Sequence, residues 1–153
     1  MKKIIFGISF LILAFGLFNL SYSATTEITD LVDTFQRSTD LQKSQILKDN
    51  LGKEFSAGGR VSNAGEYDFF DIVNDVKGLY YQVSTDQQKT KNNVPYQVIF
   101  LFKDQNKVKD IDKGQNFQKD GKIIRMEDER LQISVWLFCD ELASQDKALL
   151  KGN

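Results

Sequence analysis

The stretch Tyr96-Gln97-Val98-Ile99-Phe100-Leu101-Phe102 decides the fold that the sequence predicts. It is apolar at nearly every position, which is typical of a strand whose two sides are both covered. A second strong strand is predicted over residues 131–139, where apolar and polar residues alternate. Leu79-Tyr80-Tyr81-Gln82-Val83 indicates a third strand, with Tyr80 and Tyr81 on opposite sides and one of the two in the core. These segments predict a mainly β domain.

Two further strands, at residues 55–63 and 115–126, complete a predicted set of five. The first carries the pair Gly58-Gly59, where a backbone can bend or bulge sharply. Residues 65–78 are expected to form either a loop or part of the following strand. In the polar segment 103–113, Val108 and Ile111 have helical spacing, which indicates one or two helical turns.

Residues 25–50 have a helical pattern and form either one helix or a helical hairpin. The apolar positions of the first part are Ile28, Leu31, Val32 and Phe35. Ser38 and Thr39 can cap a second part, whose apolar positions are Leu41, Ile46 and Leu47. A helix this short is marginal by itself, so its apolar stripe must dock on the rest of the domain. It can plug one end of a barrel or cover the outer side of residues 96–102.

The order of elements is helix, bent strand, two strands, short helix and two strands. This order is typical of an OB-fold, a five-stranded barrel with a short helix between strands 3 and 4. A small antiparallel α+β sandwich is the alternative. The predicted organisation is a signal peptide (1–23), an N-terminal helical segment (24–50), an OB-fold domain (51–141) and a polar C-terminal tail (142–153).

The first 23 residues have the features of a Sec-type signal peptide. Lys2 and Lys3 precede an apolar run, and small residues lie at Ser21 and Ser23, before Ala24. An uncleaved membrane anchor is the alternative, since the run is nearly long enough to span a bilayer. Cleavage changes the formal net charge from −1 to −3, because both lysines are removed. The sequence therefore predicts a periplasmic or secreted protein with no membrane span after cleavage.

The residue content argues against the common kinds of catalytic site, so we expect no enzyme activity, no metal and no cofactor. The 153 residues include no His and one Cys, which excludes imidazole catalysis and multi-cysteine metal sites. The acidic residues Glu66, Asp68, Asp71 and Asp75 lack the spacing of a calcium loop. Glu127-Asp128-Glu129 is expected in a charged hairpin turn. Cys139 follows apolar residues and is expected to be buried, rather than in an intermolecular disulfide.

Several segments resemble OB-fold domains. Leu51-Gly52-Lys53-Glu54-Phe55-Ser56-Ala57-Gly58-Gly59-Arg60-Val61 is similar to their opening strand, and Lys113-Gly114-Gln115-Asn116-Phe117-Gln118-Lys119-Asp120-Gly121-Lys122-Ile123 to their fourth. Val135-Trp136-Leu137-Phe138-Cys139-Asp140 resembles the end of exported members of the tRNA-anticodon-domain-like OB-fold family, except that Cys139 precedes the acidic residue. The resemblance covers roughly residues 40–141. It implies a barrel with a binding surface and no particular reaction.

The sequence thus predicts an exported, non-enzymatic OB-fold binding module whose ligand is another envelope protein or a peptide. Candidate contact residues on the outer face of strands two and three, the surface that OB-folds commonly use, are Arg60, Tyr80, Gln82, Gln97 and Lys103. The alternative is binding of single-stranded nucleic acid, or of an oligosaccharide, by the same face. Residues 103–125 carry a net charge of +3, which favours nucleic acid, whereas residues 126–146 carry −5.

Overall fold

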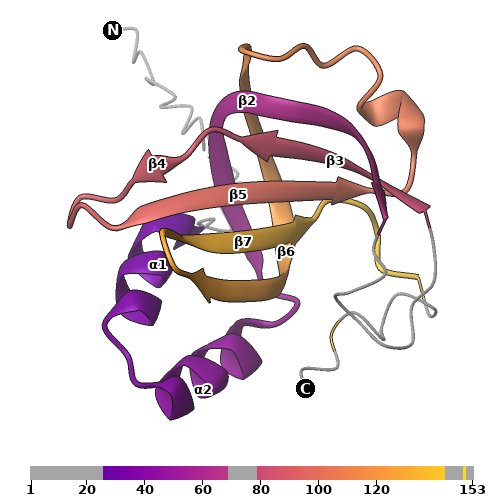
Figure 1. The fold of residues 1–153 in the computed structure, drawn as a ribbon. Coiled ribbons are helices and arrows are strands. Elements are labelled where there is room, and N and C mark those ends of the chain that lie inside the picture. The colour runs from indigo at the N-terminus through magenta and orange to yellow at the C-terminus, as the bar shows by residue number, and fades with distance from the viewer. Residues whose placement is uncertain (1–25, 69–78, 144–149, 151–153) are drawn as a thin grey trace, which may run out of the picture.

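A computed structural model of the chain describes residues 26–68, 79–143 and 150 (Figure 1), so the predicted leader lies outside the described residues. The helices are α1 (Ile28–Gln36), α2 (Asp40–Asn50) and the 3-10 turn η1 (Gln105–Lys107). The strands are β1 (Thr26–Glu27), β2 (Glu54–Asp68), β3 (Leu79–Thr85), β4 (Gln88–Lys89), β5 (Pro95–Phe102), β6 (Asn116–Glu129) and β7 (Gln132–Phe138). In the described part of the chain, no helix has both the length and the apolar composition needed to cross a membrane.

Five strands form a ring of hydrogen bonds in the order β2-β3-β5-β7-β6, which returns to β2. The ring closes because β2 is long: residues 54–60 pair with β6, and residues 61–68 pair with β3. The register of β2 shifts between Val61 and Asn63, at the point where it changes partner. β5 and β7 are parallel, and the other neighbours in the ring are antiparallel. The mainly β prediction is confirmed: the five predicted strands form the ring, and the sheet also contains the two-residue strands β1 and β4.

The interior of the ring is the main hydrophobic core. Strand alternation directs one set of side chains inwards, and most of them are buried: Phe55, Ala57, Val61, Val83, Tyr96, Val98, Phe100, Phe102, Ile123, Met126, Ile133, Val135 and Leu137. The half-buried Phe117 lies edge-on to Phe100, with ring centroids 5.1 Å apart. Each fully buried large apolar side chain stabilises the fold by about 1.5–3 kcal/mol. The ring is therefore filled with side chains.

The helix α1 packs against this interior rather than against the outer side of β5. Its residues Ile28, Val32 and Phe35 belong to the same cluster of buried side chains as the interior strand residues. The buried carboxylate of Asp33 accepts hydrogen bonds from Thr90 Oγ1 and Asn92 Nδ2, which lie between β4 and β5. Apolar contacts and buried polar bonds together therefore fix α1 on the ring.

The helix α2 is held more loosely. Lys43 bridges to Asp128 at the end of β6, and its ammonium lies 5.6 Å from the centre of the Phe35 ring. Ile46 and Leu47 are half-buried against the core, as their spacing predicted. Leu41 is 83% exposed, so the prediction that it belongs to the apolar stripe was wrong. Leu41 lies in the first turn of α2, one residue after the N-terminal Asp40.

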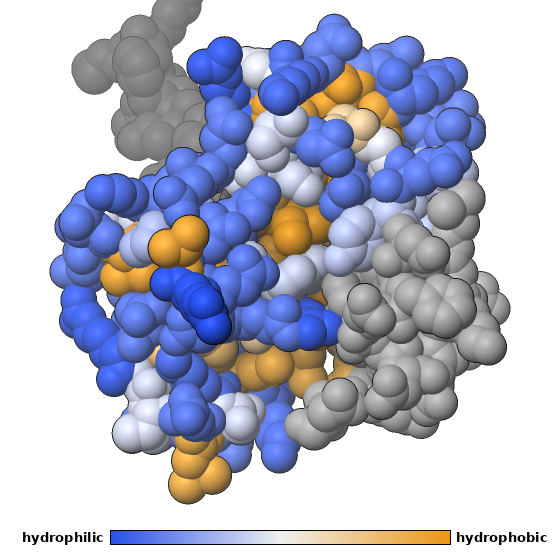
Figure 2. All heavy atoms as spheres, in the orientation of Figure 1, coloured by the Kyte–Doolittle hydropathy of each residue, from blue (hydrophilic) through white to orange (hydrophobic). Residues whose placement is uncertain are grey.

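A second apolar cluster covers the outer side of the ring. It consists of Tyr80, Ile99, Leu101, Ile124, Trp136 and Phe138, with Tyr67, Leu142 and Leu150 packed against it. Figure 2 shows apolar residues over β5 and β7 with polar residues around them. The prediction that both sides of residues 96–102 are covered is confirmed, since Phe100 and Leu101 are both fully buried. The predicted C-terminal tail thus contributes Leu142 and Leu150 to this outer cluster.

Three predicted boundaries change. β2 extends through residues 65–68, while residues 69–78 lie outside the described part. β6 continues to Glu129 instead of turning at Glu127, because its antiparallel pairing with β7 extends to Glu129, opposite Gln132. The segment 103–113 forms only the single turn η1, followed by the buried Val108. The Asp140 carboxylate accepts a hydrogen bond from the Lys103 N–H at 2.7 Å and pairs with Lys107.

The hydrogen bonds that Asp33 accepts from Thr90 and Asn92 give a prediction about stability. Asp33→Ala removes the acceptor for two hydrogen bonds, and such bonds to a charged group contribute about 1.5–3 kcal/mol each. We expect the free energy of unfolding, measured by urea titration, to fall by about 3 kcal/mol. The exposed Asp30 on the same helix is the control, and Asp30→Ala should change stability by less than about 1 kcal/mol. Equal effects of the two substitutions would contradict the stabilising role of the Asp33 hydrogen bonds.

Candidate ligand-binding surface

The five predicted contact residues lie in three different places. Tyr80, Gln82 and Gln97 are on the outer side of β3 and β5, where Gln82 pairs with Leu101 and Ser84 with Ile99. Lys103 directly follows β5, and its backbone is bound to Asp140. Arg60 lies on β2, and its Nε donates to the Gly114 carbonyl at 3.1 Å. The structure therefore brings Gln82 and Gln97 to one face, and Arg60 lies on a different strand pair.

The prediction that Tyr80 is an exposed contact residue was wrong. Its side chain points away from the ring interior as predicted, but it is only 3% exposed. The ring lies edge-on to Phe138, with centroids 6.2 Å apart and planes at 75°. Alternation shows which side of a strand a residue occupies, but it does not show that a second cluster covers the outer side. Tyr80 is therefore part of the packing of the outer cluster.

Gln97 is half-buried and belongs to a chain of side-chain amides. The Gln87 amide donates to Gln132 Oε1 at 3.1 Å, and Gln132 Nε2 donates to Gln97 Oε1 at 2.9 Å. Gln97 Nε2 then donates to the Thr85 carbonyl at 3.0 Å, at the break between β3 and β4. Sequence reasoning missed Gln87 and Gln132. The alternation over residues 131–139 places Gln132 on the same side of the strand as Trp136. This pattern could have identified Gln132 as a residue of the outer side.

Gln82 differs from Gln97 because its amide is only partly used. Its Oε1 accepts a hydrogen bond from Ser84 Oγ at 3.2 Å. Within the described residues, the Gln82 amide nitrogen has no hydrogen-bond partner, although the side chain is half-buried. We call the polar residues of this side the amide face: Gln82, Ser84, Gln87, Gln97 and Gln132. These five residues are uncharged; on the same outer side the Arg125 guanidinium lies 5.3 Å from the centre of the Trp136 ring and pairs with Glu127.

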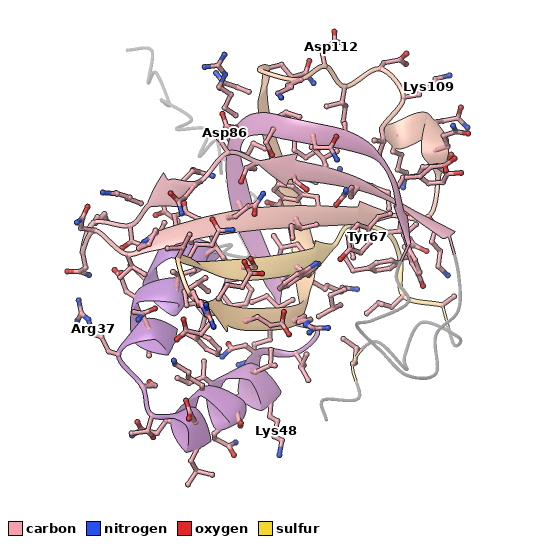
Figure 3. All side chains as sticks on the ribbon, in the orientation of Figure 1. Arg37, Lys48, Tyr67, Asp86, Lys109 and Asp112 are labelled. Carbon is pink, nitrogen blue, oxygen red and sulfur yellow. The ribbon has the colours of Figure 1, made fainter. Side chains whose placement is uncertain are left out.

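Among the charged side chains that Figure 3 labels, four point outwards from loops and from α2: Arg37, Lys48, Lys109 and Asp112. The fifth, the exposed Asp86, lies between β3 and β4 and directly precedes Gln87. The residues of the amide face carry no formal charge, so they present hydrogen-bonding dipoles and no Coulombic attraction for a phosphate backbone. The surface suits a ligand with neutral donors and acceptors.

A shallow hollow of about 620 Å³ lies on another part of the surface, over the pair Gly58-Gly59. The residues that line it are Gly58, Gly59, Gln88, Asn116, Phe117 and Gln118. Gln88 Nε2 donates to the Gly58 carbonyl at 2.8 Å, and a Cβ on Gly59 would lie 2.2 Å from this nitrogen. Glycine at 59 therefore makes room for Gln88, which bridges β2 and β4. Since these residues do not titrate near neutral pH, the hollow offers no acid–base chemistry.

The acidic residues considered in the sequence do not form a metal site in the described part of the chain. No group of three or more Cys, Asp or Glu side chains is placed there to hold a metal ion. Glu66 is exposed, whereas Asp71 and Asp75 lie outside the described residues. Glu127 and Asp128 are engaged in ion pairs with Arg125 and Lys43.

Comparison with known proteins identifies no relative: no protein-family model, no curated protein and no solved structure matches the chain. What the protein binds is therefore inferred from its own residues and their geometry.

The different environments of the two glutamines can be tested by substitution. Gln97→Leu leaves Gln132 Nε2 without its acceptor and removes a donor to Thr85, so we expect a loss of about 1–2 kcal/mol in unfolding free energy. Gln82→Leu removes one weak hydrogen bond, and we expect a change within about 0.5 kcal/mol. Urea unfolding followed by tryptophan fluorescence measures both. A larger loss of unfolding free energy for Gln82→Leu than for Gln97→Leu would contradict the structural role assigned to Gln97.

The single thiol gives a prediction about pH. Cys139 is half-buried, so the prediction that it is buried holds only in part. Its Sγ lies 3.6 Å from the Leu137 carbonyl, and desolvation raises the pKa of the thiol from 9.0 to about 12. The folded protein should react very slowly with a disulfide reagent at neutral pH, because the thiolate is the reactive species. Between about pH 9 and 12 the unfolded thiol ionises before the folded one, so stability should fall as pH rises. Rapid labelling of folded protein at pH 7 would contradict this burial.

Proposed function

We propose that the chain is an exported, non-enzymatic binding module with an OB-fold, and that its ligand is a segment of another envelope protein or a peptide. The ring order β2-β3-β5-β7-β6 supports the OB-fold barrel, as does the position of η1 between β5 and β6, the third and fourth ring strands in chain order. The parallel pair β5–β7 supports it further, since it joins the two ends of the antiparallel meander. The leader in residues 1–23 supports export to the periplasm or beyond.

The amide face is the observation that carries the choice of ligand. Four of its five residues lie on ring strands that are packed on both sides, and Gln87 lies between β3 and β4, so most of its polar groups are held in place before a ligand arrives. Neutral amides pair well with a peptide backbone, which offers an N–H and a C=O at almost every residue. Binding of nucleic acid would instead require Lys or Arg at the contacting surface. Neither is present among the five residues of the amide face, and Arg125, which lies over Trp136 on the same outer side, is paired with Glu127.

This proposal is tested by offering three classes of ligand to the mature chain, residues 24–153. The probes are a phage-displayed library of short random peptides, single-stranded oligothymidine at low ionic strength, and a panel of neutral oligosaccharides. We expect peptides to be enriched and the other two probes not to bind. Gln82→Arg should weaken the enriched peptides roughly tenfold, because it places a bulky charge on the amide face.

The matched control for Gln82→Arg is Gln118→Arg, which makes the same change at an exposed position on β6. The control should leave peptide binding unchanged. Salt-sensitive binding of oligothymidine, or saturable binding of an oligosaccharide without any peptide, would overturn the proposal in favour of the nucleic-acid or carbohydrate alternative.

A further inference from the structure

One stretch of the ring has an unpaired edge. In its first half, β2 is bound to β6 on one side and to β1 at residues 55 and 56 on the other. In its second half it pairs with β3 only. Beyond Val61, which bonds to the 114–115 loop, residues 62–66 make no other backbone hydrogen bond to any described residue. We call Ser62–Glu66 the open edge. Among the described strands in Figure 1, none lies beside this half of β2 on the side away from β3, where the picture shows only the segment that joins β5 to β6.

The open edge lacks most of the features that protect strand edges in folded proteins. Such edges are usually blocked by lysine, by proline or by a covering element. The sequence here is Ser62-Asn63-Ala64-Gly65-Glu66, in which Glu66 is the only charged residue. Asn63 and Glu66 are exposed. A Cβ built on Gly65 would have no described atom within 4 Å, so no described side chain covers the outer face of the strand at this position.

Gly65 connects the open edge to the amide face. Its partner in the register is Gln82, the residue whose amide nitrogen is unused within the described part of the chain. Both residues lie on the outer side of the ring, and Asn63 and Tyr67 flank Gly65 along the same row. Because Gly65 has no side chain, nothing from β2 separates Gln82 from a ligand lying along the edge. A side chain of the ligand can therefore fill this gap and accept a hydrogen bond from Gln82.

We propose that an extended peptide segment of a partner protein adds to the open edge of β2 as a further strand, with one side chain seated over Gly65. This inference rests on the proposed function and specifies its site. Every second residue of a strand directs its N–H and C=O to the free edge, which is the pattern that an added strand recognises. On the opposite row, the exposed carboxylate of Glu66 fits a Lys or Arg of the partner.

A partner of different sequence fits the edge better than a second copy of this chain. Two copies paired through this edge would bring two Glu66 carboxylates to one short ribbon, where like charges destabilise the pairing. The mature chain also carries a formal net charge of −3. A cationic peptide gains from both features, so enriched peptides should contain an excess of Lys and Arg.

The substitution Gly65→Val separates binding from folding. The backbone at Gly65 is not in the left-handed region, and a valine would meet no described atom, so the fold accepts it. Valine also favours the extended conformation, so the urea midpoint should not fall. The isopropyl group fills the gap over Gly65, and we expect at least a roughly tenfold weaker affinity for the peptides enriched from the library. Gln118→Val, on the exposed side of β6, is the control and should bind like the original chain.

Hydrogen exchange is a second measurement, and it locates the bound peptide on the chain, which an affinity measurement does not do. When a saturating amount of enriched peptide is added, the backbone amides of alternate residues in the open edge should become protected. Those of β6 should not change. The inference would be overturned if the peptide protected backbone amides of the amide face and left those of the open edge unprotected.

The outcomes distinguish this inference from the broader proposal. If peptides are enriched and Gly65→Val binds them as tightly as the original chain, the edge is not the site, although a peptide-binding module remains. If no peptide is enriched, both proposals fail. If the chain instead forms a dimer by analytical ultracentrifugation and Gly65→Val makes it monomeric, the edge joins two copies, and the proposed partner is wrong.

Discussion

The pairing of β2 with two different strands is the constraint on which the rest of the structure depends. Residues 54–60 hold β6, and residues 61–68 hold β3, so this one strand closes the ring. Without that closure, the inward side chains of β5 and β7 would face an open sheet and lose much of their burial. The register shift between Val61 and Asn63 allows the change of partner, because a bulge increases the local twist and bends the strand.

Closure also explains why the domain has two apolar clusters. A ring of five strands is narrow, and its interior is filled by one side chain from every second residue. The other side of β5 and β7 is still rich in apolar residues, such as Leu101 and Trp136, so it too must be covered. The helix α1 packs against the inner cluster, while Leu142 and Leu150 from the end of the chain pack on the outer one. Segments outside the ring are therefore part of its hydrophobic packing.

The strands were predictable from sequence because local alternation encodes them, whereas the environment of their outer side was not. The pattern around residues 79–83 separates Tyr80 from Tyr81 correctly, yet it does not reveal that Phe138 covers Tyr80. The sequence pattern placed Gln97 on the surface, but its amide nitrogen donates a hydrogen bond to the carbonyl of Thr85, the last residue of β3. Leu41 matched an apolar stripe by type alone. For Tyr80 and Gln97 the deciding contact comes from a residue distant in sequence, whereas Leu41 is 83% exposed.

The open edge is a consequence of the same geometry that stabilises the ring. β2 must leave β6 in order to join β3, and the edge that faced β6 is then unpaired beyond Val61. A full helix between β5 and β6 could cover such an edge, but this chain has only the three-residue turn η1 there. The missing side chain at Gly65 lowers the β propensity of the strand, which is a cost to stability without any packing gain nearby. That cost has a physical reason if the empty space at Gly65 receives a side chain from a bound strand.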